Sequence, residues 1–234
     1  HIRGSQISYI FQDPTASLNP LISIGEQIQE IFMVHNKMSK RETKEKTLEI
    51  MNLLELRPAQ NYFWLFPHQL SGGMNQRVMI AMAIASRPKL LIADEPTSSL
   101  DRITEIKILN ILLDLNKRFN LSIILITHNI SIIEDFAQRV AIMYAGRIVE
   151  IGPTDQLLHS PKHPYTKALL GCVPRNIGKD NFLNTIKGSV PDLSKLPKGC
   201  KFNPRCPYVM DKCLIEEPEF REVSKEQFVK CYLW

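Results

Sequence analysis

The sequence predicts an α/β fold in which helices pack on a parallel β-sheet, and two observations carry this prediction. Residues 90–93 and 122–126 form short, continuous apolar runs with the length and composition of buried parallel strands. Between the two runs, apolar residues recur at helical spacing, at Ile106, Leu109, Leu112 and Leu113. Strand–helix–strand alternation of this kind favours a parallel sheet covered by helices.

The preceding zone, residues 6–87, opens with a predicted strand and continues as helices. Residues 7–11 are β-branched or aromatic and end at Gln12-Asp13-Pro14, which is typical of a strand followed by a turn. Helical spacing occurs twice after this turn, at Ile24, Ile28, Ile31 and Phe32 and then at Leu48, Met51 and Leu54. A hairpin is predicted around Ala145-Gly146, and we expect the first domain to cover residues 1–153.

The remaining residues, 154–234, differ in composition from the rest. Proline recurs there, four of the five cysteines fall within the last 35 residues, and apolar periodicity is weak. We therefore predict a small, loop-rich Pro/Cys-rich extension rather than a continuation of the sheet.

Overall composition excludes several protein classes. With 44% hydrophobic and 23% charged residues, the chain is neither a disordered polymer nor a fibrous repeat. The net charge of +5 is mild and no dense Lys/Arg block occurs, so we expect no nucleic-acid partner. The longest apolar run, residues 78–85, is well short of the roughly 18 residues that a membrane span needs.

A first candidate site lies at Ser71-Gly72-Gly73, directly before a strongly helical run. Two glycines at a helix N-terminus let backbone N–H groups approach an anion, and the helix dipole favours negative charge there. The same residues are equally typical of a plain helix cap, so this motif alone leaves both interpretations open.

A second candidate site is Asp94-Glu95, where two carboxylates follow a predicted buried strand. Ligands of open α/β sheets bind at the carboxyl ends of the strands. Asp94 is suited to hold Mg²⁺, and Glu95 to orient and polarise an attacking water. The alternative is a capped strand exit without catalytic function.

His128 also follows a predicted strand, 34 residues after Asp94. One strand–helix–strand unit takes about 30 residues, so we expect these two strand ends to be neighbours and His128 to reach a phosphate bound there. A structural role for His128 is the alternative, and Gln12, at the end of the first predicted strand, has the same ambiguity.

Taken in order, these segments resemble the nucleotide-binding domain of ABC transporters. They correspond to the Q-loop glutamine (Gln12), the signature motif (residues 70–76), Walker B with the catalytic glutamate (Asp94 and Glu95), the D-loop (residues 98–101) and the switch histidine (His128). The resemblance implies a RecA-like parallel sheet core and a helical subdomain at about residues 24–87. A generic α/β domain does not explain the joint match.

The resemblance also implies cofactors and roles. ATP and Mg²⁺ are the expected cofactors, with Asp94 and Gln12 serving Mg²⁺ and Glu95 polarising the water. His128 contacts the γ-phosphate. Two such subunits pair head to tail, and the remaining nucleotide-contacting residues are then expected to be Ser71, Gly72, Gly73, Gln76 and Asp101.

Two further segments are similar to the oligopeptide/dipeptide/nickel branch of ABC importers: residues 10–20 and the run from His163-Pro164-Tyr165 to Leu170. This resemblance implies an ATPase subunit on the cytoplasmic face of the plasma membrane. Its implied partners are a second ATPase subunit, two transmembrane permease subunits and, indirectly, an extracytoplasmic solute-binding protein. The alternatives are a nickel or other small-solute importer ATPase, a soluble ABC-type ATPase acting on ribosomes or DNA, and a non-catalytic subunit.

The sequence departs from the family at several points. It contains no Gly-x-x-x-x-Gly-Lys-Ser/Thr motif (Walker A), which the family places upstream of the Q-loop. We expect this phosphate cradle to precede His1, and the present chain alone to be inactive. In addition, Asn129 follows the switch histidine where Asp is usual, and Asn75 stands where Arg or Lys is frequent.

The cysteine spacing Cys200-x5-Cys206-x6-Cys213-x17-Cys231 is not that of a zinc ribbon. Thiolates suit zinc or an iron–sulfur cluster, and unligated thiols are the alternative. Members of the resembling branch carry a four-cysteine cluster in this region, which implies a 4Fe–4S cluster here. A cytoplasmic location argues against disulfides.

Overall fold

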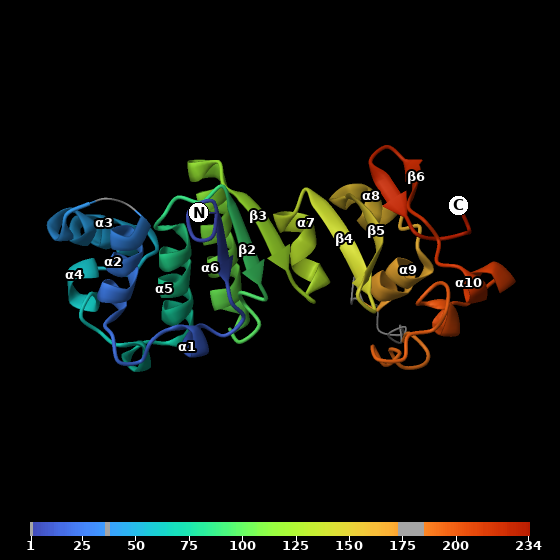
Figure 1. Ribbon diagram of the computed structural model, residues 1–234, viewed down its shortest axis with the longest axis horizontal. Helices are drawn as coiled ribbons and strands as arrows, with labels where there is room; N and C mark the ends of the chain where they lie inside the picture. Colours follow the sequence, from blue (N-terminus) through green and yellow to red (C-terminus); the bar gives the residue numbers. More distant parts are fainter. Residues whose placement is uncertain (1, 36–37, 173–184) are drawn as a thin grey trace. The chain divides into compact units, whose positions relative to one another are not determined.

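The computed structural model describes residues 2–35, 38–172 and 185–234. Contacts divide the chain into two compact units, His1–His128 and Asn129–Trp234, each described by itself below (Figure 1). This division falls before the hairpin, whereas the sequence suggested a boundary after residue 153. Of the expected extension at residues 154–234, residues 173–184 lie outside the described part.

The first unit contains the predicted parallel sheet. Its strand order is β1-β2-β3, and both pairings are parallel, with Ile7 opposite Leu90 and Asp94 opposite Ile126. The sequence prediction of a parallel sheet is confirmed. The strands are β1 (Ile7–Ile10), β2 (Leu90–Asp94) and β3 (Ser122–Ile126).

The third strand differs from the prediction in its burial. Residues 122–126 were expected to be buried, yet Ile124 and Ile126 are 49% and 45% exposed. Both side chains lie on the same face of the sheet as Tyr9 of β1, which is 38% exposed, so the exposure belongs to one face of the sheet. Continuous apolar sequence therefore identified the strand correctly but not its exposure.

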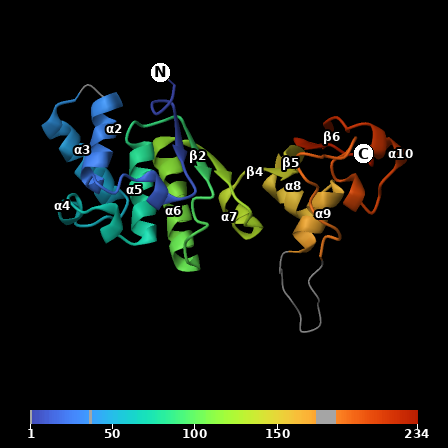
Figure 2. The ribbon, with the colours of Figure 1, turned by 60° about the horizontal axis from the view of Figure 1, so that its bottom comes forward.

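Helices make up most of the rest of the first unit. In both Figures 1 and 2, α2, α3 and α4 lie on the opposite side of α5 from the strands, and α5 packs against β1 and α6. Residues 24–87, expected as a helical subdomain, hold α2 through α5. The helices are α1 (Pro14–Ser17), α2 (Ile24–His35), α3 (Lys40–Leu53), α4 (Ala59–Tyr62), η1 (Pro67–Gln69), α5 (Gly72–Ile84) and α6 (Arg102–Phe119).

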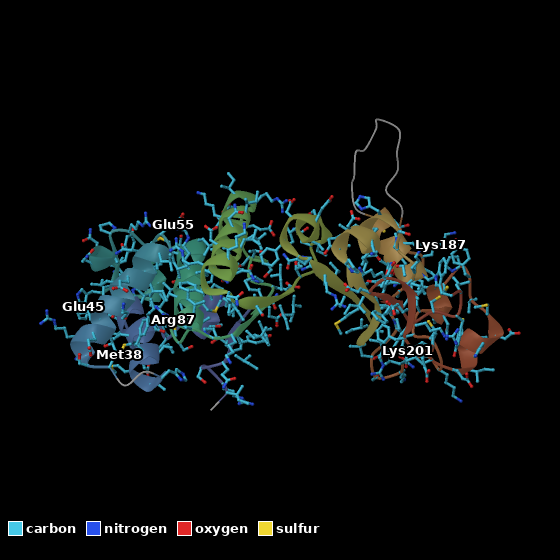
Figure 3. The ribbon with its side chains drawn as sticks, turned by 90° about the horizontal axis from the view of Figure 1, so that it is seen from above. Met38, Glu45, Glu55, Arg87, Lys187 and Lys201 are labelled. Carbon is cyan, nitrogen blue, oxygen red and sulfur yellow. The ribbon has the colours of Figure 1, made fainter. Side chains whose placement is uncertain are left out.

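Local sequence sets the ends of these helices. Ser39 and Glu42 form a capping box at the start of α3. The last helix of the unit, α6, is capped at its C-terminus by Asn120, whose left-handed backbone (φ 50°) closes the final turn. Glu55, labelled in Figure 3, forms an ion pair with Arg77 of α5 at 3.1 Å and ties the end of α3 to α5.

The second unit is built around an antiparallel sheet of order β4-β5-β7-β6. The hairpin predicted around Ala145-Gly146 is present as β4 (Arg139–Tyr144) and β5 (Arg147–Pro153). Its other elements are η2 (Ile130–Ile132), α7 (Ile133–Phe136), α8 (Thr154–His159), α9 (Pro164–Gly171), η3 (Asn203–Arg205), α10 (Asp211–Ile215), β6 (Arg221–Ser224) and β7 (Gln227–Val229).

The residues from 154 onward add two short strands to the antiparallel sheet of the hairpin, whereas the parallel sheet holds only β1, β2 and β3 among the described strands. Strand β7 pairs with β5, with Glu150 opposite Val229, and β6 pairs with β7. These strands are only three and four residues long, so they leave almost no periodicity in the sequence. The core beneath them includes Val140, Tyr144, Leu157 and Phe202.

Candidate functional site

The carboxyl edge of the parallel sheet presents two adjacent acidic residues from β2. Asp94 is the last residue of the strand, and the backbone N–H of Glu95 still donates to the carbonyl of Ile126, at 2.9 Å. Glu95 then adopts a left-handed backbone, with φ of 43°. Such a conformation is costly for a residue other than glycine and occurs preferentially at functional sites.

The Glu95 carboxylate is held from both sides by side chains of the neighbouring strand ends. The amide nitrogen of Gln12, after β1, donates to Oε2 at 3.2 Å, and Nδ1 of His128, after β3, lies 2.9 Å from Oε1. Since a carboxylate only accepts hydrogen bonds, the proton of the second bond is carried by the imidazole. The strand ends expected from spacing to be neighbours are therefore neighbours.

The site is open to a ligand. The His128 side chain is 75% exposed and that of Glu95 is 25% exposed. Asn129, the residue after the histidine, caps the short helix η2 by accepting from the backbone N–H of Ser131 at 3.2 Å. Its departure from the family's usual Asp thus leaves a satisfied helix start beside His128.

A residue that the sequence did not single out contacts Asp94. The hydroxyl of Tyr9 donates to Oδ2 of Asp94 at 2.6 Å. This bond raises the pKa of Tyr9 and is the largest cause of that shift. Once β1 and β2 are known to be parallel, a polar residue on β1 facing Asp94 is the signal that could have identified Tyr9.

The glycine motif begins α5, as predicted. Ser71 caps the helix, its hydroxyl accepting from the backbone N–H of Met74 at 3.3 Å. Gly73 packs so closely on α6 that a Cβ there would lie 2.6 Å from Cγ2 of Thr104, whereas a Cβ at Gly72 would meet its nearest neighbour, on Leu100, at an ordinary 3.6 Å. The two glycines therefore have different structural requirements.

Asp101 joins this motif from the adjacent loop. It caps α6 by accepting from the backbone N–H groups of Ile103 and Thr104, each at 3.0 Å, and from the Thr104 hydroxyl at 2.6 Å. These bonds, the hydroxyl first, hold the pKa of Asp101 below its usual value. Asp101, Thr104 and Gly73 thus form one junction between the starts of α5 and α6.

Gln76 differs from the other predicted site residues of this motif because its side chain is buried. It is 1% exposed within α5, so its side chain does not reach the surface that carries Ser71 and Gly72. The contact of Gln76 with nucleotide, which the resemblance implies, stays a prediction. Asn75, the other unusual residue of the motif, is also buried and donates to the carbonyl of Pro67 at 3.0 Å.

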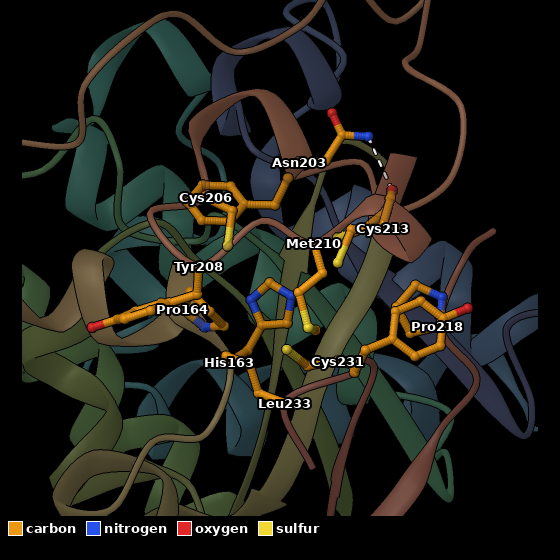
Figure 4. Close-up of a pocket in the computed structure, with 13 residues that line it drawn as sticks. His163, Pro164, Asn203, Cys206, Tyr208, Met210, Cys213, Pro218, Cys231 and Leu233 are labelled. Carbon is orange, nitrogen blue, oxygen red and sulfur yellow. Dashed lines mark hydrogen bonds between the residues drawn. The ribbon is translucent and has the colours of Figure 1, made fainter. Parts of the chain in front are cut away.

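The second unit gathers the four C-terminal cysteines around one small cavity. Cys206, Cys213 and Cys231 face the ring of His163 in Figure 4, and Cys200 also lines this cavity. Burial raises the pKa of Cys200 to about 11, and it is the main cause of the raised pKa of Cys206 and Cys231 as well. Within the described residues, no three His, Cys, Asp or Glu side chains stand close enough to hold a single metal ion.

A buried carboxylate organises the histidine beside that cavity, and no sequence pattern indicated it. Glu150 is 0% exposed and accepts from the backbone N–H groups of Lys162 and His163 at 2.8 and 2.9 Å and from the Gln227 amide at 2.8 Å. Burial lowers the pKa of His163 to about 4. Its Nδ1 accepts from the backbone N–H of Tyr165 at 3.0 Å, which caps α9.

Comparison with protein families gives two matches along the chain. Residues 1–98 match the ABC transporter family, and residues 149–213 match the family described as the oligopeptide/dipeptide transporter C-terminal region. Within the described residues, no helix is both long and apolar enough to cross a membrane.

Sequence similarity to individual relatives covers all or nearly all of this chain. The oligopeptide transport ATP-binding protein AppD of Bacillus subtilis is 45% identical over 233 residues, which are 100% of this chain and 71% of the relative. The dipeptide transport ATP-binding protein DppD of Escherichia coli is 42% identical, covering 98% of this chain and 70% of the relative. The oligopeptide transport ATP-binding protein OppD of Escherichia coli is 43% identical, covering 99% and 68%.

Solved structures with the same fold align with a smaller share of this chain than these relatives do. A dimeric post-hydrolysis state of the ATP-binding cassette MJ0796, bound to ADP and Pi, aligns with a TM-score of 0.57 at 30% identity, over 64% of each chain. The structure of cbiO1 from Clostridium perfringens, part of an ABC transporter complex, aligns with a TM-score of 0.59 at 27% identity, over 67% of this chain and 60% of that one. From its motifs, its fold and its identity to these relatives, the chain belongs to the ATP-binding subunits of oligopeptide and dipeptide ABC transporters.

Proposed function

We propose that this chain is part of the ATPase that drives peptide import through separate membrane subunits, with Glu95 as its catalytic carboxylate. The observation that carries the proposal is the Glu95 carboxylate held between Gln12 and His128 at the carboxyl edge of the sheet. Hydrolysis of ATP requires a positioned water and stabilisation of charge on the γ-phosphate. This arrangement supplies groups for both tasks.

In this mechanism Glu95 orients the attacking water and accepts its proton. The hydrogen bonds from Gln12 and His128 fix the direction of the carboxylate before the nucleotide arrives. His128 is exposed and lies on the same carboxylate, so its ring is available to the γ-phosphate. Because the 234 residues contain no Walker A motif, tests of hydrolysis require the full-length subunit.

Asp94 and Gln12 are the residues that we assign to Mg²⁺. The donor chemistry fits, because Mg²⁺ prefers oxygen ligands, and a carboxylate and an amide carbonyl lie at the same sheet edge. Gln12 uses its nitrogen on Glu95, which leaves its carbonyl oxygen for the metal. When bound, Mg²⁺ neutralises charge on the β- and γ-phosphates.

A second copy or a related subunit completes the site in this proposal. Gly72 and Gly73 begin a 13-residue helix capped by Ser71, and its N–H groups and dipole suit a phosphate held by the partner. Asp101 lies at the same junction. The solved cassette similar to this chain is described as dimeric with ADP and Pi bound, which supports this pairing.

The remaining partners follow from the relatives, which are named for oligopeptide and dipeptide transport. We propose two permease subunits, a cytoplasmic-face location at the plasma membrane, and an indirect link to an extracytoplasmic binding protein. Labelled oligopeptide uptake by vesicles carrying the complete transporter should require ATP and be lost in Asp94→Asn. The exposed Glu219→Ala control should retain uptake. Uptake of Ni²⁺ but not of peptide would instead support the nickel-importer alternative.

We also propose that Cys200, Cys206, Cys213 and Cys231 hold a 4Fe–4S cluster. Support comes from the donor set, since four thiols line one cavity and thiolates are the ligands of iron–sulfur clusters. Iron content and visible absorption after anaerobic purification test this. Cys206→Ser should lose both signals and Cys172→Ser, outside the cavity, should keep them. Iron-free, colourless and folded wild-type protein would contradict the proposal.

A further inference from the structure

Tyr9 and Asp94 face each other across the first two strands of the parallel sheet. Tyr9 is opposite Ile92 in the register of β1 and β2, and Asp94 follows Ile92 by two residues. Side chains two residues apart on a strand share a face, so Asp94 lies diagonally ahead of Tyr9 on the same side of the sheet. A long aromatic side chain can reach a diagonal neighbour, and the Tyr9 hydroxyl does so at 2.6 Å.

The phenol is placed for this contact by its own neighbours. The ring of Phe11, the residue directly after β1, packs on the ring of Tyr9 with centroids 4.8 Å apart. A phenol is protonated near neutral pH, so the Tyr9 hydroxyl is the donor and the Asp94 carboxylate the acceptor. The contact is thus a hydrogen bond to a carboxylate, which is shorter and stronger than one between neutral groups.

The hydrogen bond from Tyr9 determines which carboxylate oxygen of Asp94 is available to bind a metal ion. Tyr9 occupies Oδ2, and this fixes the plane of the carboxylate while leaving Oδ1 for another partner. Carboxylates that bind metals are commonly held by such outer hydrogen bonds, and loss of one typically costs about 10–100-fold in metal affinity. In the Mg²⁺ assignment above, Asp94 is the residue whose orientation matters most.

We propose that Tyr9 is a positioning residue for the metal site of this ATPase, and that its hydroxyl orients Asp94 toward the nucleotide-bound divalent cation. The inference rests on the proposed role of Asp94. Tyr9 itself contacts neither nucleotide nor metal in this account, so its effect should be seen in cation affinity rather than in nucleotide affinity measured without the cation.

The test uses the full-length subunit with a non-hydrolysable ATP analogue and Mn²⁺ as the metal probe, free Mn²⁺ being measured by electron paramagnetic resonance. Tyr9→Phe keeps the ring and removes only the hydroxyl. We expect it to weaken Mn²⁺ binding about 10–100-fold, with unchanged affinity for the analogue in EDTA. Tyr62→Phe makes the same chemical change in α4 and should bind Mn²⁺ like wild type. Circular dichroism melting confirms that each variant is folded.

Comparing the two variants distinguishes the positioning role of Tyr9 from the metal-binding role of Asp94 on which it rests. If Asp94→Asn weakens Mn²⁺ binding but Tyr9→Phe binds as tightly as wild type or more tightly, the role of Tyr9 is overturned and that of Asp94 stands. If Asp94→Asn itself binds Mn²⁺ like wild type, the metal assignment fails and the role of Tyr9 fails with it.

Discussion

Nδ1 of His128 lies 2.9 Å from Oε1 of Glu95, although the two residues are separated by a helix of 18 residues and a strand. The contact exists because β2 and β3 are parallel neighbours and both end at the same edge of the sheet. Each residue therefore restricts the other: the imidazole directs the carboxylate, and the carboxylate selects the ring nitrogen that carries the proton.

His128→Ala removes one of the two side chains that hold Glu95 and one donor near the γ-phosphate. We expect the ATPase rate of the full-length subunit to fall about 10²–10³-fold, as for loss of one charge-stabilising donor, with ATP affinity nearly unchanged. His159→Ala is a matched control, because His159 also pairs with a carboxylate, Asp155, at 3.2 Å in α8. Equal rates in the two variants would contradict a catalytic role for His128.

Gly73→Ala tests the close approach of α5 to α6. The added Cβ would lie 2.6 Å from Cγ2 of Thr104, a β-branched side chain whose hydroxyl is held by Asp101. We expect destabilisation of about 1–3 kcal/mol by urea denaturation, the usual cost of overpacking. Gly72→Ala has ordinary contacts and should be neutral or slightly stabilising.

A second substitution tests whether the contact with Cγ2 of Thr104 causes the loss of stability. Thr104→Ser removes Cγ2 and keeps the hydroxyl that Asp101 accepts from, so it should relieve most of the Gly73→Ala defect in the double variant. If the double variant is as unstable as Gly73→Ala alone, the steric explanation is wrong.

The Asp101 cap predicts a pH-dependent contribution to stability. Its pKa is lowered in the folded protein from the ordinary 3.8, chiefly by the Thr104 hydroxyl. A lowered carboxyl pKa stabilises the fold above the unfolded-state value, and this contribution is lost as pH falls through the folded-state value. Wild type should therefore melt at a higher temperature than Asp101→Asn at neutral pH. The difference should shrink below about pH 3.8, and a constant difference across that range would contradict the assignment.

Glu150→Ala should be strongly destabilising to the second unit. It would leave the backbone N–H groups of Lys162 and His163 and the Gln227 amide without their buried acceptor. We expect a loss of at least about 3 kcal/mol, because each buried donor left without an acceptor costs about 1–3 kcal/mol. Glu219→Ala, on an exposed residue of the same unit, should change stability by less than about 0.5 kcal/mol.

Fluorescence of Trp234 gives a local reading of this effect. Its indole N–H donates to the carbonyl of Lys162 at 3.2 Å, next to the segment that Glu150 holds. Trp64→Phe removes the only other tryptophan of the chain, so that Trp234 alone reports urea unfolding. An unchanged midpoint in Glu150→Ala would show that the three donors find other acceptors.

Sequence patterns predicted much of the first unit because its signals are local. The apolar runs identified β2 and β3, the turn residues ended β1 before Gln12, and Ser71 began α5 as expected. Neighbouring strand ends followed from the length of one crossover. The sequence could not reveal that one face of β3 is exposed, because this depends on which elements pack on that face of the sheet.

What the sequence missed depends on contacts between distant residues. Tyr9 matters only because β1 pairs with β2, 83 residues later along the chain at Ile92. Glu150 of β5 resembles a surface charge until Gln227 of β7 and the backbone of Lys162 and His163 donate hydrogen bonds to it. Gln76 shares a motif with exposed residues, but helical geometry turns it inward. None of these outcomes is contained in local propensity.

The central claim is that Glu95, held by Gln12 and His128, is the catalytic carboxylate. Glu95→Gln keeps the size of the side chain and removes its ability to accept the proton of water. In the full-length subunit we expect ATP binding near the wild-type affinity. ATP hydrolysis should fall by about 10²–10⁴-fold, the typical contribution of a general base.

Measuring both quantities on the same preparation tests the claim most directly, with ATP affinity by equilibrium binding and phosphate release by steady-state assay. The account predicts that Glu95→Gln binds ATP and does not turn it over. Phosphate release at the wild-type rate would contradict it.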